Sequence, residues 1–261
     1  MYPSNSKTIM FVSGAFVSHN YWENWILFFE NQGYKVVAPP WIHKNDNAEN
    51  LRIENSSTKI GSITLNNLLS YYEEIIEILP EKPVLIGHSY GGLLVQLLVQ
   101  KDLAAAGICI NSFPPSGYTA FKFSYLKHIF KFSCNLLSLK MTYNLSFRNW
   151  QNIFYNATSN EQQLKTYQKY WIPESKKALR GLFSGKAKIN FRKKHAPILL
   201  ISCSDDQMIS PKLVYWNYKK YRNVHAITCY KSFDDQNHFT ILHPEWEAPA
   251  EHILKWLDKI F

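Results

Sequence analysis

The fold of this chain is decided by the stretch Pro83-Val84-Leu85-Ile86-Gly87-His88-Ser89-Tyr90-Gly91-Gly92-Leu93-Leu94. A short apolar run leads into a G-x-S-x-G box, and a helical apolar pattern follows it. This order predicts a strand, a sharp turn and a helix, with Ser89 on the turn and small residues two positions before and after it. Such a turn lifts the Ser89 hydroxyl above the strand ends. It also aims the Tyr90 amide and the positive end of the new helix at a developing oxyanion.

Short β-branched runs alternate with longer amphipathic segments along most of the chain, a pattern typical of βα units and a mainly parallel sheet. Strands are expected at residues 8–12, 34–38, 84–86, 105–110, 198–203 and 226–230. Helices are expected at residues 21–31, 63–79 and 90–101, after Pro211, and at 244–260. Residues 41–59 are polar and are expected to form a loop.

The periodicity changes after Asn111. Residues 113–194 are aromatic, basic and helical in pattern, without a convincing buried strand, so we expect an inserted helical lid between two parts of a core, 1–112 and 195–261. Between Tyr118 and Lys194 there are 15 Lys and Arg against two acidic residues, although the whole chain carries only +9. This basic lid is either a solvated face or a weak contact for an anionic membrane. No nucleic-acid recognition module accompanies the charge, and no nucleic-acid partner is expected.

Composition narrows the class of protein further. The chain has 261 residues, 46% of them hydrophobic and 15% aromatic, which is typical of an ordinary folded protein. Its apolar runs are shorter than the roughly 18 residues that span a bilayer, and its start lacks the layout of a secretory signal. The four cysteines have neither metal-ligand spacing nor a disulfide pattern. We therefore expect a cytoplasmic protein without a metal.

A serine hydroxyl becomes a good nucleophile when a base takes its proton and a carboxylate orients that base. In a parallel sheet these groups lie on loops at the carboxyl ends of later strands. His238 follows the last predicted strand and is favoured as the base over His243. Asp206 follows the strand at 198–203 and is favoured as the acid, with Asp205 as the alternative. Asp234 and Asp235 are read as caps of their loop.

The second oxyanion donor is expected from the loop after the first strand, Ser13-Gly14-Ala15-Phe16. Gly14 lets the backbone approach the reaction centre. The Ala15 amide is the first candidate to act with the Tyr90 amide, and the Phe16 amide is the second. Phe16 and Trp41 are candidates to line the substrate pocket, with simple core packing as the alternative for each.

Taken together, the Gly87–Gly92 box, the Ser13–Phe16 loop, Asp206 and His238 resemble the α/β-hydrolase fold superfamily. Residues 22–40 and the ending from Asn237 to Trp246 are similar to a group of small bacterial hydrolases, and more distantly to plant methylesterases and hydroxynitrile lyases. The resemblance implies a sheet of about six strands with helices on both faces, a Ser-His-Asp triad, a helical cap and no cofactor. The first loop departs from the superfamily because Ser13 stands where a histidine is usual.

The leading hypothesis is therefore a serine hydrolase that cleaves a carboxylic ester or lactone of a small to medium apolar substrate through an acyl-enzyme on Ser89. Two alternatives stay open at this point. One is a cofactor-free lyase of hydroxynitrile-lyase type, in which His238 acts as base without an acyl-enzyme. The other is a catalytically idle member of the fold that binds a ligand.

Overall fold

The computed structural model describes residues 6–53, 57–116, 141–154 and 159–261. A sheet of six parallel strands runs through its centre, in the order β2-β1-β3-β4-β7-β8. The strands are β1 (Thr8–Val12), β2 (Lys35–Val37), β3 (Val84–His88), β4 (Ala106–Ile110), β7 (Ile198–Cys203) and β8 (Thr228–Phe233). The prediction of a mainly parallel six-stranded sheet is confirmed.

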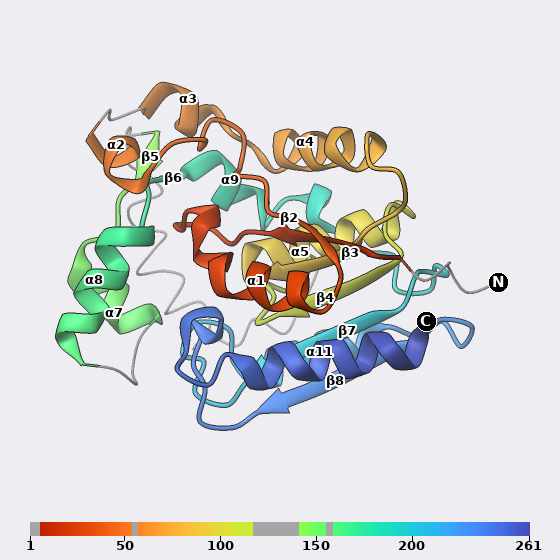
Figure 1. The fold of residues 1–261 in the computed structure, drawn as a ribbon. Coiled ribbons are helices and arrows are strands. Elements are labelled where there is room, and N and C mark those ends of the chain that lie inside the picture. The colour runs from red at the N-terminus through yellow and green to blue at the C-terminus, as the bar shows by residue number, and fades with distance from the viewer. Residues whose placement is uncertain (1–5, 54–56, 117–140, 155–158) are drawn as a thin grey trace.

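Helices cover both faces of this sheet, as Figure 1 shows. The main ones are α1 (Glu23–Asn31), α4 (Leu65–Glu77), α5 (Tyr90–Gln100), α10 (Pro211–Lys220) and α11 (Glu247–Ile260). On the face of the sheet turned toward the viewer in Figure 1, α1 contacts the segment before α11. The Trp25 indole of α1 donates to the Ile241 carbonyl there over 3.1 Å. On the other face α5 packs against β3 and β4. There the Asn217 side chain of α10 donates to Gln96 of α5 over 2.9 Å.

The core is built on the four central strands, β1, β3, β4 and β7, all of whose residues are buried. Beside β1, the short helix η1 (His19–Trp22) and α1 add a cluster of aromatic rings, in which Phe11 stacks on Trp22 with ring centroids 4.4 Å apart. Strands buried on both faces read as continuous apolar runs, which explains why they could be located from the sequence. The ends of these rigid strands carry the candidate site.

The expectation of a loop over residues 41–59 is wrong. Two short helices lie in this region, α2 (Ala48–Ile53) and α3 (Ser57–Ser62). Ala48, Leu51 and Ile60 are buried, although the sequence around them is polar. The Arg52 guanidinium donates to the Trp171 carbonyl over 2.9 Å. The helices therefore form because a distant segment covers their few apolar residues, which local sequence does not reveal.

The described part of the predicted lid contains β5 (Thr142–Tyr143), α7 (Phe147–Phe154), α8 (Asn160–Tyr170), β6 (Glu174–Ser175), α9 (Lys176–Gly181) and the turn η2 (Gly185–Ala187). In Figure 1, α7 and α8 lie beyond the carboxyl ends of the sheet strands. Strands β5 and β6 pair antiparallel, which corrects the expectation that this segment has no strand. The lid boundaries at 113 and 194 stay a prediction. Residues 117–140 of this basic segment lie outside the described residues, and the membrane contact is also still a prediction.

The last sheet strand ends later than the sequence suggests, at Phe233 instead of Tyr230. Lys231 and Ser232 interrupt the apolar run, but β8 is an edge strand whose residues are only partly buried, so polar residues are tolerated there.

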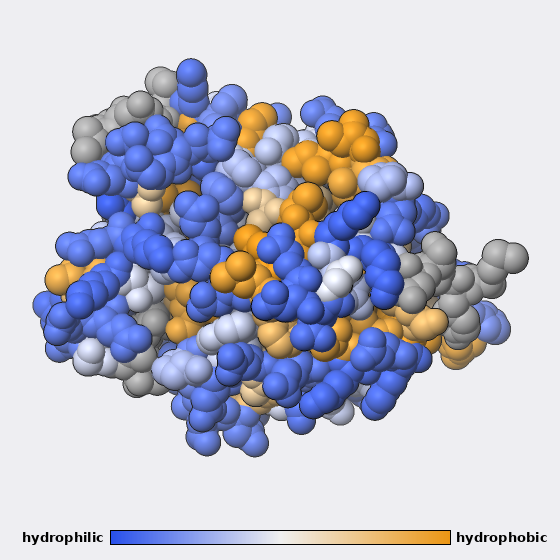
Figure 2. Space-filling view, in the orientation of Figure 1, coloured by the Kyte–Doolittle hydropathy of each residue, from blue (hydrophilic) through white to orange (hydrophobic). Residues whose placement is uncertain are grey.

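The face shown in Figure 2 is mainly hydrophilic, with hydrophobic side chains gathered over α1 and α4. In the described ranges, none of the helices is both long and apolar enough to cross a membrane.

Candidate active site

Ser89 occupies the sharp turn between β3 and α5. Its backbone lies at φ 57° and ψ −115°, a sparsely populated region that costs a non-glycine residue about 1–3 kcal/mol. The neighbouring glycines make the turn sterically possible. A Cβ at Gly91 would lie 2.0 Å from the Val12 carbonyl oxygen, and one at Gly87 would lie 2.4 Å from the Gly91 carbonyl oxygen. This backbone conformation places the Ser89 hydroxyl at the carboxyl ends of the strands, as the G-x-S-x-G box predicts.

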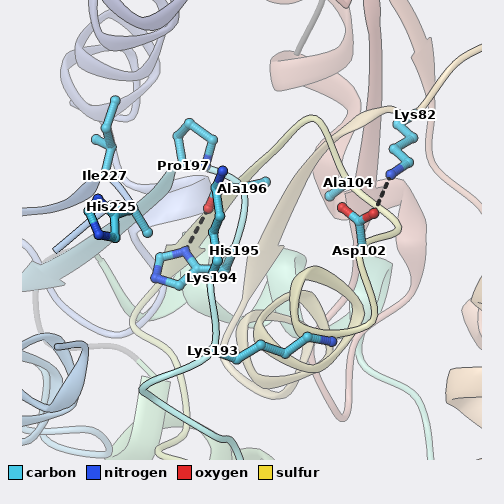
Figure 3. A pocket seen from close by; sticks show the side chains of 11 residues that line it. Lys82, Asp102, Ala104, Lys193, Lys194, His195, Ala196, Pro197, His225 and Ile227 are labelled. Carbon is cyan, nitrogen blue, oxygen red and sulfur yellow. Dashed lines mark hydrogen bonds and ion pairs between the residues drawn. The ribbon is translucent and has the colours of Figure 1, made fainter. Parts of the chain in front are cut away.

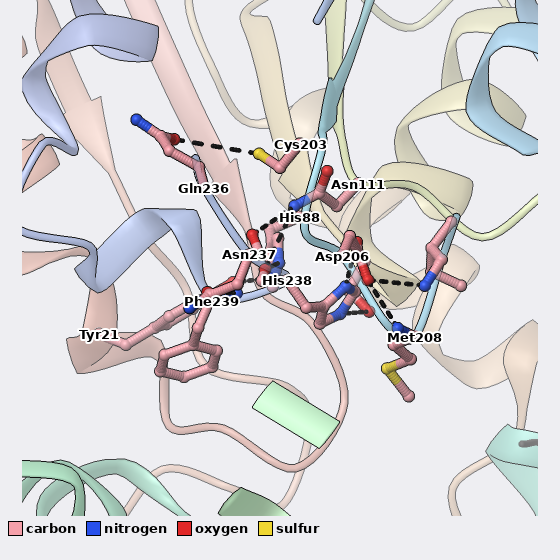
Figure 4. Close-up of polar contacts among 12 residues, drawn as sticks. Tyr21, His88, Asn111, Cys203, Asp206, Met208, Gln236, Asn237, His238 and Phe239 are labelled. Carbon is pink, nitrogen blue, oxygen red and sulfur yellow. Dashed lines mark hydrogen bonds and ion pairs between the residues drawn. The ribbon is translucent and has the colours of Figure 1, made fainter. Parts of the chain in front are cut away.

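Three side chains from distant parts of the chain meet at this turn, and two of them, Asp206 and His238, are labelled in Figure 4. His238 Nε2 lies 3.0 Å from Ser89 Oγ, and His238 Nδ1 lies 2.7 Å from Asp206 Oδ2. All three residues are buried, with Ser89 and Asp206 each 4% exposed. Asp206 follows β7 and His238 follows β8, so the parallel strands bring both loops to the same edge of the sheet.

The carboxylate of Asp206 is held by its own loop. Its Oδ1 accepts hydrogen bonds from the Met208 and Ile209 amides, at 2.8 Å and 2.7 Å. This leaves Oδ2 to accept from the imidazole of His238. The neighbouring Asp205 is exposed, and its carboxylate accepts a bond from the Ser204 hydroxyl over 2.9 Å. The structure therefore brings Asp206, and not Asp205, onto the imidazole.

This arrangement fixes the tautomer of His238. A carboxylate without a proton only accepts hydrogen bonds, so Nδ1 carries the proton in the bond to Asp206. The lone pair of Nε2 then faces Ser89 Oγ. An imidazole in this state can take the serine proton, and the buried carboxylate stabilises the charge that develops on it.

The backbone of His238 is supported by two residues whose role the sequence analysis missed. His88 Nε2 donates to the His238 carbonyl over 2.7 Å, and the Asn111 amide donates to the same carbonyl over 3.3 Å. Burial, and then the electrostatic interaction with the neighbouring imidazole of His238, hold the pKa of His88 well below its ordinary value, so this ring stays neutral. Its Nδ1 faces the Tyr21 hydroxyl at 3.4 Å, and that hydroxyl accepts from the Gly14 amide at 3.2 Å. Asn111 stands directly after β4 at the carboxyl edge, a position that could have indicated its role.

His243, the less favoured candidate for the base, is buried as well. This residue is 9% exposed and its Nδ1 accepts a hydrogen bond from the Glu245 amide over 3.2 Å, which fixes the turn before α11. Burial lowers the pKa of its imidazole, against the opposing charges of Glu245 and Asp205. His243 therefore serves the local backbone and takes no part in the contacts around Ser89.

The loop after β1 lies directly against the nucleophile. A Cβ built on Gly14 would lie 3.3 Å from Ser89 Cβ, so the loop backbone approaches the elbow closely. The Phe16 amide donates to the Glu174 carboxylate over 2.9 Å and is therefore unavailable to a substrate. Within the described part of the chain, the Ala15 and Tyr90 amides have no hydrogen-bond partner. These two amides remain the candidate oxyanion donors.

The two predicted pocket residues lie near the elbow, and both are packed into the protein. Trp41 is 2% exposed, donates its indole N–H to the Ser13 carbonyl over 3.1 Å and meets the Tyr90 ring edge-on at 5.1 Å. Phe16, also 2% exposed, meets the Tyr143 ring at 5.7 Å. Their contact with a substrate stays a prediction. On the other side of the site, Trp150 of α7 packs on Phe239, the residue after His238, at 5.5 Å.

A cavity of about 770 Å³ lies elsewhere (Figure 3). Its lining includes Lys82, Ala104, Pro197 and Ile227, which precede β3, β4, β7 and β8, so it is at the amino ends of the strands, opposite Ser89. Lys82 there pairs with Asp102 at 2.8 Å. In the described ranges, no group of three or more His, Cys, Asp or Glu side chains is placed to hold a metal ion.

Comparison with known proteins identifies the family and the fold. Residues 9–250 match the model of the alpha/beta hydrolase family, so the chain belongs to that family. Among curated proteins, none matches the sequence significantly.

Three solved structures illustrate the shared fold. The monoacylglycerol lipase of Paleococcus ferrophilus is 18% identical, with a TM-score of 0.70 over 97% of this chain and 95% of the lipase. A methylesterase from Arabidopsis is 13% identical, with a TM-score of 0.67 over 96% and 98% of the two chains. Methylketone synthase I from tomato is also 13% identical, with a TM-score of 0.70 over 98% and 99%. At these identities the likeness concerns the fold.

Proposed function

We propose that this protein is a serine hydrolase that cleaves a carboxylic ester or lactone through an acyl-enzyme on Ser89. The observation that carries the proposal is the series of hydrogen bonds from Ser89 through His238 to Asp206, with lengths of 3.0 Å and 2.7 Å. A binding scaffold has no need of a buried serine, imidazole and carboxylate in this order, whereas acyl transfer uses all three.

In the proposed reaction, Ser89 Oγ attacks the substrate carbonyl while His238 Nε2 takes its proton. The Ala15 and Tyr90 amides donate to the oxyanion, and Asp206 stabilises the imidazolium. The imidazolium then protonates the leaving alcohol, which departs as the acyl-enzyme forms. In the second half, His238 takes a proton from water, the hydroxide attacks the acyl group, and the proton returns to Ser89 as the acid is released.

The side chains around the site favour an apolar acyl group or ring. Aromatic residues of the loop after β1 and of the lid segment pack on one another, Phe16 with Tyr143 and Trp150 with Phe239, the residue after His238. Aromatic surfaces bind apolar groups by burying area and by ring packing. We therefore expect short- to medium-chain esters and lactones as substrates.

The test is hydrolysis of p-nitrophenyl acetate, butyrate and octanoate and of a γ- and a δ-lactone by the wild type and by Ser89→Ala. The wild type should turn over at least one of them, and the variant should lose at least 10³-fold in kcat. Ser62→Ala, at an exposed hydroxyl that donates to the Lys59 carbonyl, is the matched control and should keep full activity. Equal rates for wild type and Ser89→Ala would contradict the proposal, and binding without turnover across the panel would favour a ligand-binding role.

A further inference from the structure

A buried ion pair lies next to the site and has no part in the mechanism described so far. Lys44 Nζ lies 2.7 Å from Glu174 Oε2, and the two side chains are 2% and 0% exposed. Burial lowers the pKa of the Lys44 ammonium, and the charge of Glu174 opposes this shift. Because removing two charges from water is costly, such a pair persists where further hydrogen bonds hold it.

The Glu174 carboxylate holds one residue of the loop after β1. Its Oε2 accepts from the Phe16 amide at 2.9 Å, while its Oε1 accepts from the Ser175 amide at 2.8 Å. The Phe16 carbonyl in turn accepts from the Ile172 amide at 3.0 Å. Both backbone groups of Phe16 are therefore bound by residues 172–174. These bonds hold Phe16 at φ 68°, a left-handed conformation that few non-glycine residues adopt.

Lys44 also contacts the same loop indirectly, through the side chain of Trp41. Its ammonium lies 4.3 Å from the centre of the Trp41 ring, and the Trp41 indole donates to the Ser13 carbonyl over 3.1 Å. The loop from Ser13 to Phe16 is thus held at its start through Trp41 and at its end through Glu174. The Ala15 amide lies between these two points of the chain, next to Gly14, whose backbone approaches Ser89.

The charges explain why a pair is needed and not a single group. A carboxylate can accept at both oxygens, as Glu174 does, whereas the amide of a glutamine accepts at one position only. A lone negative charge near the elbow would oppose an oxyanion there. Together with burial, the charge of Glu174 raises the pKa of the Tyr90 phenol. The ammonium of Lys44 offsets that charge.

We propose that Lys44 and Glu174 are positioning residues that hold the Ala15 amide in its oxyanion-binding place and so couple segment 172–174 to the catalytic serine. This inference rests on the proposed function. If it holds, turnover depends on Glu174, a residue of the lid segment that lies 130 positions after Lys44 in the chain.

The test compares two double variants in the full-length protein. Lys44→Met with Glu174→Leu removes both charges and the acceptor for Phe16, while Lys44→Met with Glu174→Gln keeps one acceptor. Lys165→Met with Glu161→Gln, at an exposed ion pair on α8, is the matched control. The measurements are kcat and KM on the best ester of the panel, at a temperature where thermal melting shows each variant to be folded.

We expect the Met/Leu variant to lose about 10- to 100-fold in kcat, less than the loss of a whole oxyanion donor, with KM changed less than threefold. The Met/Gln variant should recover part of that loss, and the control should match the wild type. A folded Met/Leu variant with wild-type kcat would overturn the proposal. If that variant does not fold, the Met/Gln variant decides: a kcat lowered at least threefold supports the proposal, and an unchanged kcat overturns it.

Hydrogen exchange separates this inference from the proposed function. The peptide covering residues 13–18 contains the Phe16 amide, which the carboxylate of Glu174 protects in the wild type. Mass spectrometry should show faster exchange of this peptide in the Met/Leu variant and no change in the control. If the wild type hydrolyses no ester but the exchange changes as expected, the proposed function fails and the positioning contact stands. Unchanged exchange in the Met/Leu variant would show that Glu174 does not protect the Phe16 amide, and the positioning contact would then be refuted.

Discussion

Asp206→Asn perturbs the site through a single atom. The Oδ1 position accepts from the Met208 and Ile209 amides, so an asparagine keeps its carbonyl oxygen there. Its NH2 group then takes the place of Oδ2, 2.7 Å from His238 Nδ1. Because an NH2 group donates, Nδ1 must accept, and the imidazole proton moves to Nε2. The ring then presents an N–H to Ser89 Oγ and can no longer take the serine proton.

The expected loss follows from this change of tautomer. In Ser-His-Asp triads the corresponding substitution lowers kcat about 10⁴-fold, and the same atoms are exchanged here. A loss of 10⁴-fold corresponds to about 5.4 kcal/mol in the activation barrier. Stability should change by only about 1–2 kcal/mol, because a hydrogen bond replaces the one that is lost. The assay is release of p-nitrophenol from a p-nitrophenyl ester at saturating substrate, with a urea titration to show that the variant is folded.

Asp205→Asn is the matched control, since the residue is adjacent in sequence but exposed, with its carboxylate on the Ser204 hydroxyl. Its kcat should stay within about twofold of the wild type, as for other exposed substitutions. The reasoning is refuted if Asp206→Asn keeps more than a tenth of the wild-type kcat while folded. It is refuted equally if the two substitutions reduce kcat by the same factor.

Two further predictions concern stability. Gly91→Ala should lower the free energy of unfolding by about 3 kcal/mol or more, because the new Cβ would lie 2.0 Å from the Val12 carbonyl oxygen. Gly185→Ala, which meets nothing within 4 Å, should change it by less than about 1 kcal/mol, and equal urea midpoints would contradict the steric argument. Burial, aided by the electrostatic interaction with the neighbouring imidazole of His238, lowers the pKa of His88, so below about pH 6.5 the unfolded chain binds a proton that the folded protein excludes. The free energy of unfolding should therefore fall as the pH falls below this value, by up to about 1.4 kcal/mol per pH unit from this group, and His88→Gln should flatten that slope. A slope unchanged by His88→Gln would show that the ring is not held neutral.

The sheet and the elbow could be predicted because their signals are local in the sequence. Strands β1, β3, β4 and β7 are buried on both faces and read as apolar runs. The small residues of the box mark the elbow, although the atom that a Cβ at Gly91 would meet belongs to Val12 of β1. The positions of Asp206 and His238 followed from one rule, that parallel strands bring their carboxyl ends to one edge. The assignment to the family confirms the fold that the sequence predicted.

The contacts that the sequence did not predict depend on distant partners. Lys44 lies in a polar stretch and looks solvated until Glu174, far along the chain, is placed beside it. The short helices α2 and α3 depend in the same way on the segment that covers them. Phe16 could not be removed from the oxyanion candidates either, because only the fold shows that its amide is bound. In each case the deciding interaction joins residues separated by more than a hundred positions.

The most direct test of the central claim is to trap the intermediate. The protein is mixed with a p-nitrophenyl ester, quenched in acid within the first turnovers and analysed by peptide mass spectrometry. We predict an acyl group on the peptide that contains Ser89, none in Ser89→Ala, and far slower formation in His238→Ala. Ester turnover by the wild type with the acyl group on another residue, or unchanged turnover by Ser89→Ala, would contradict the account.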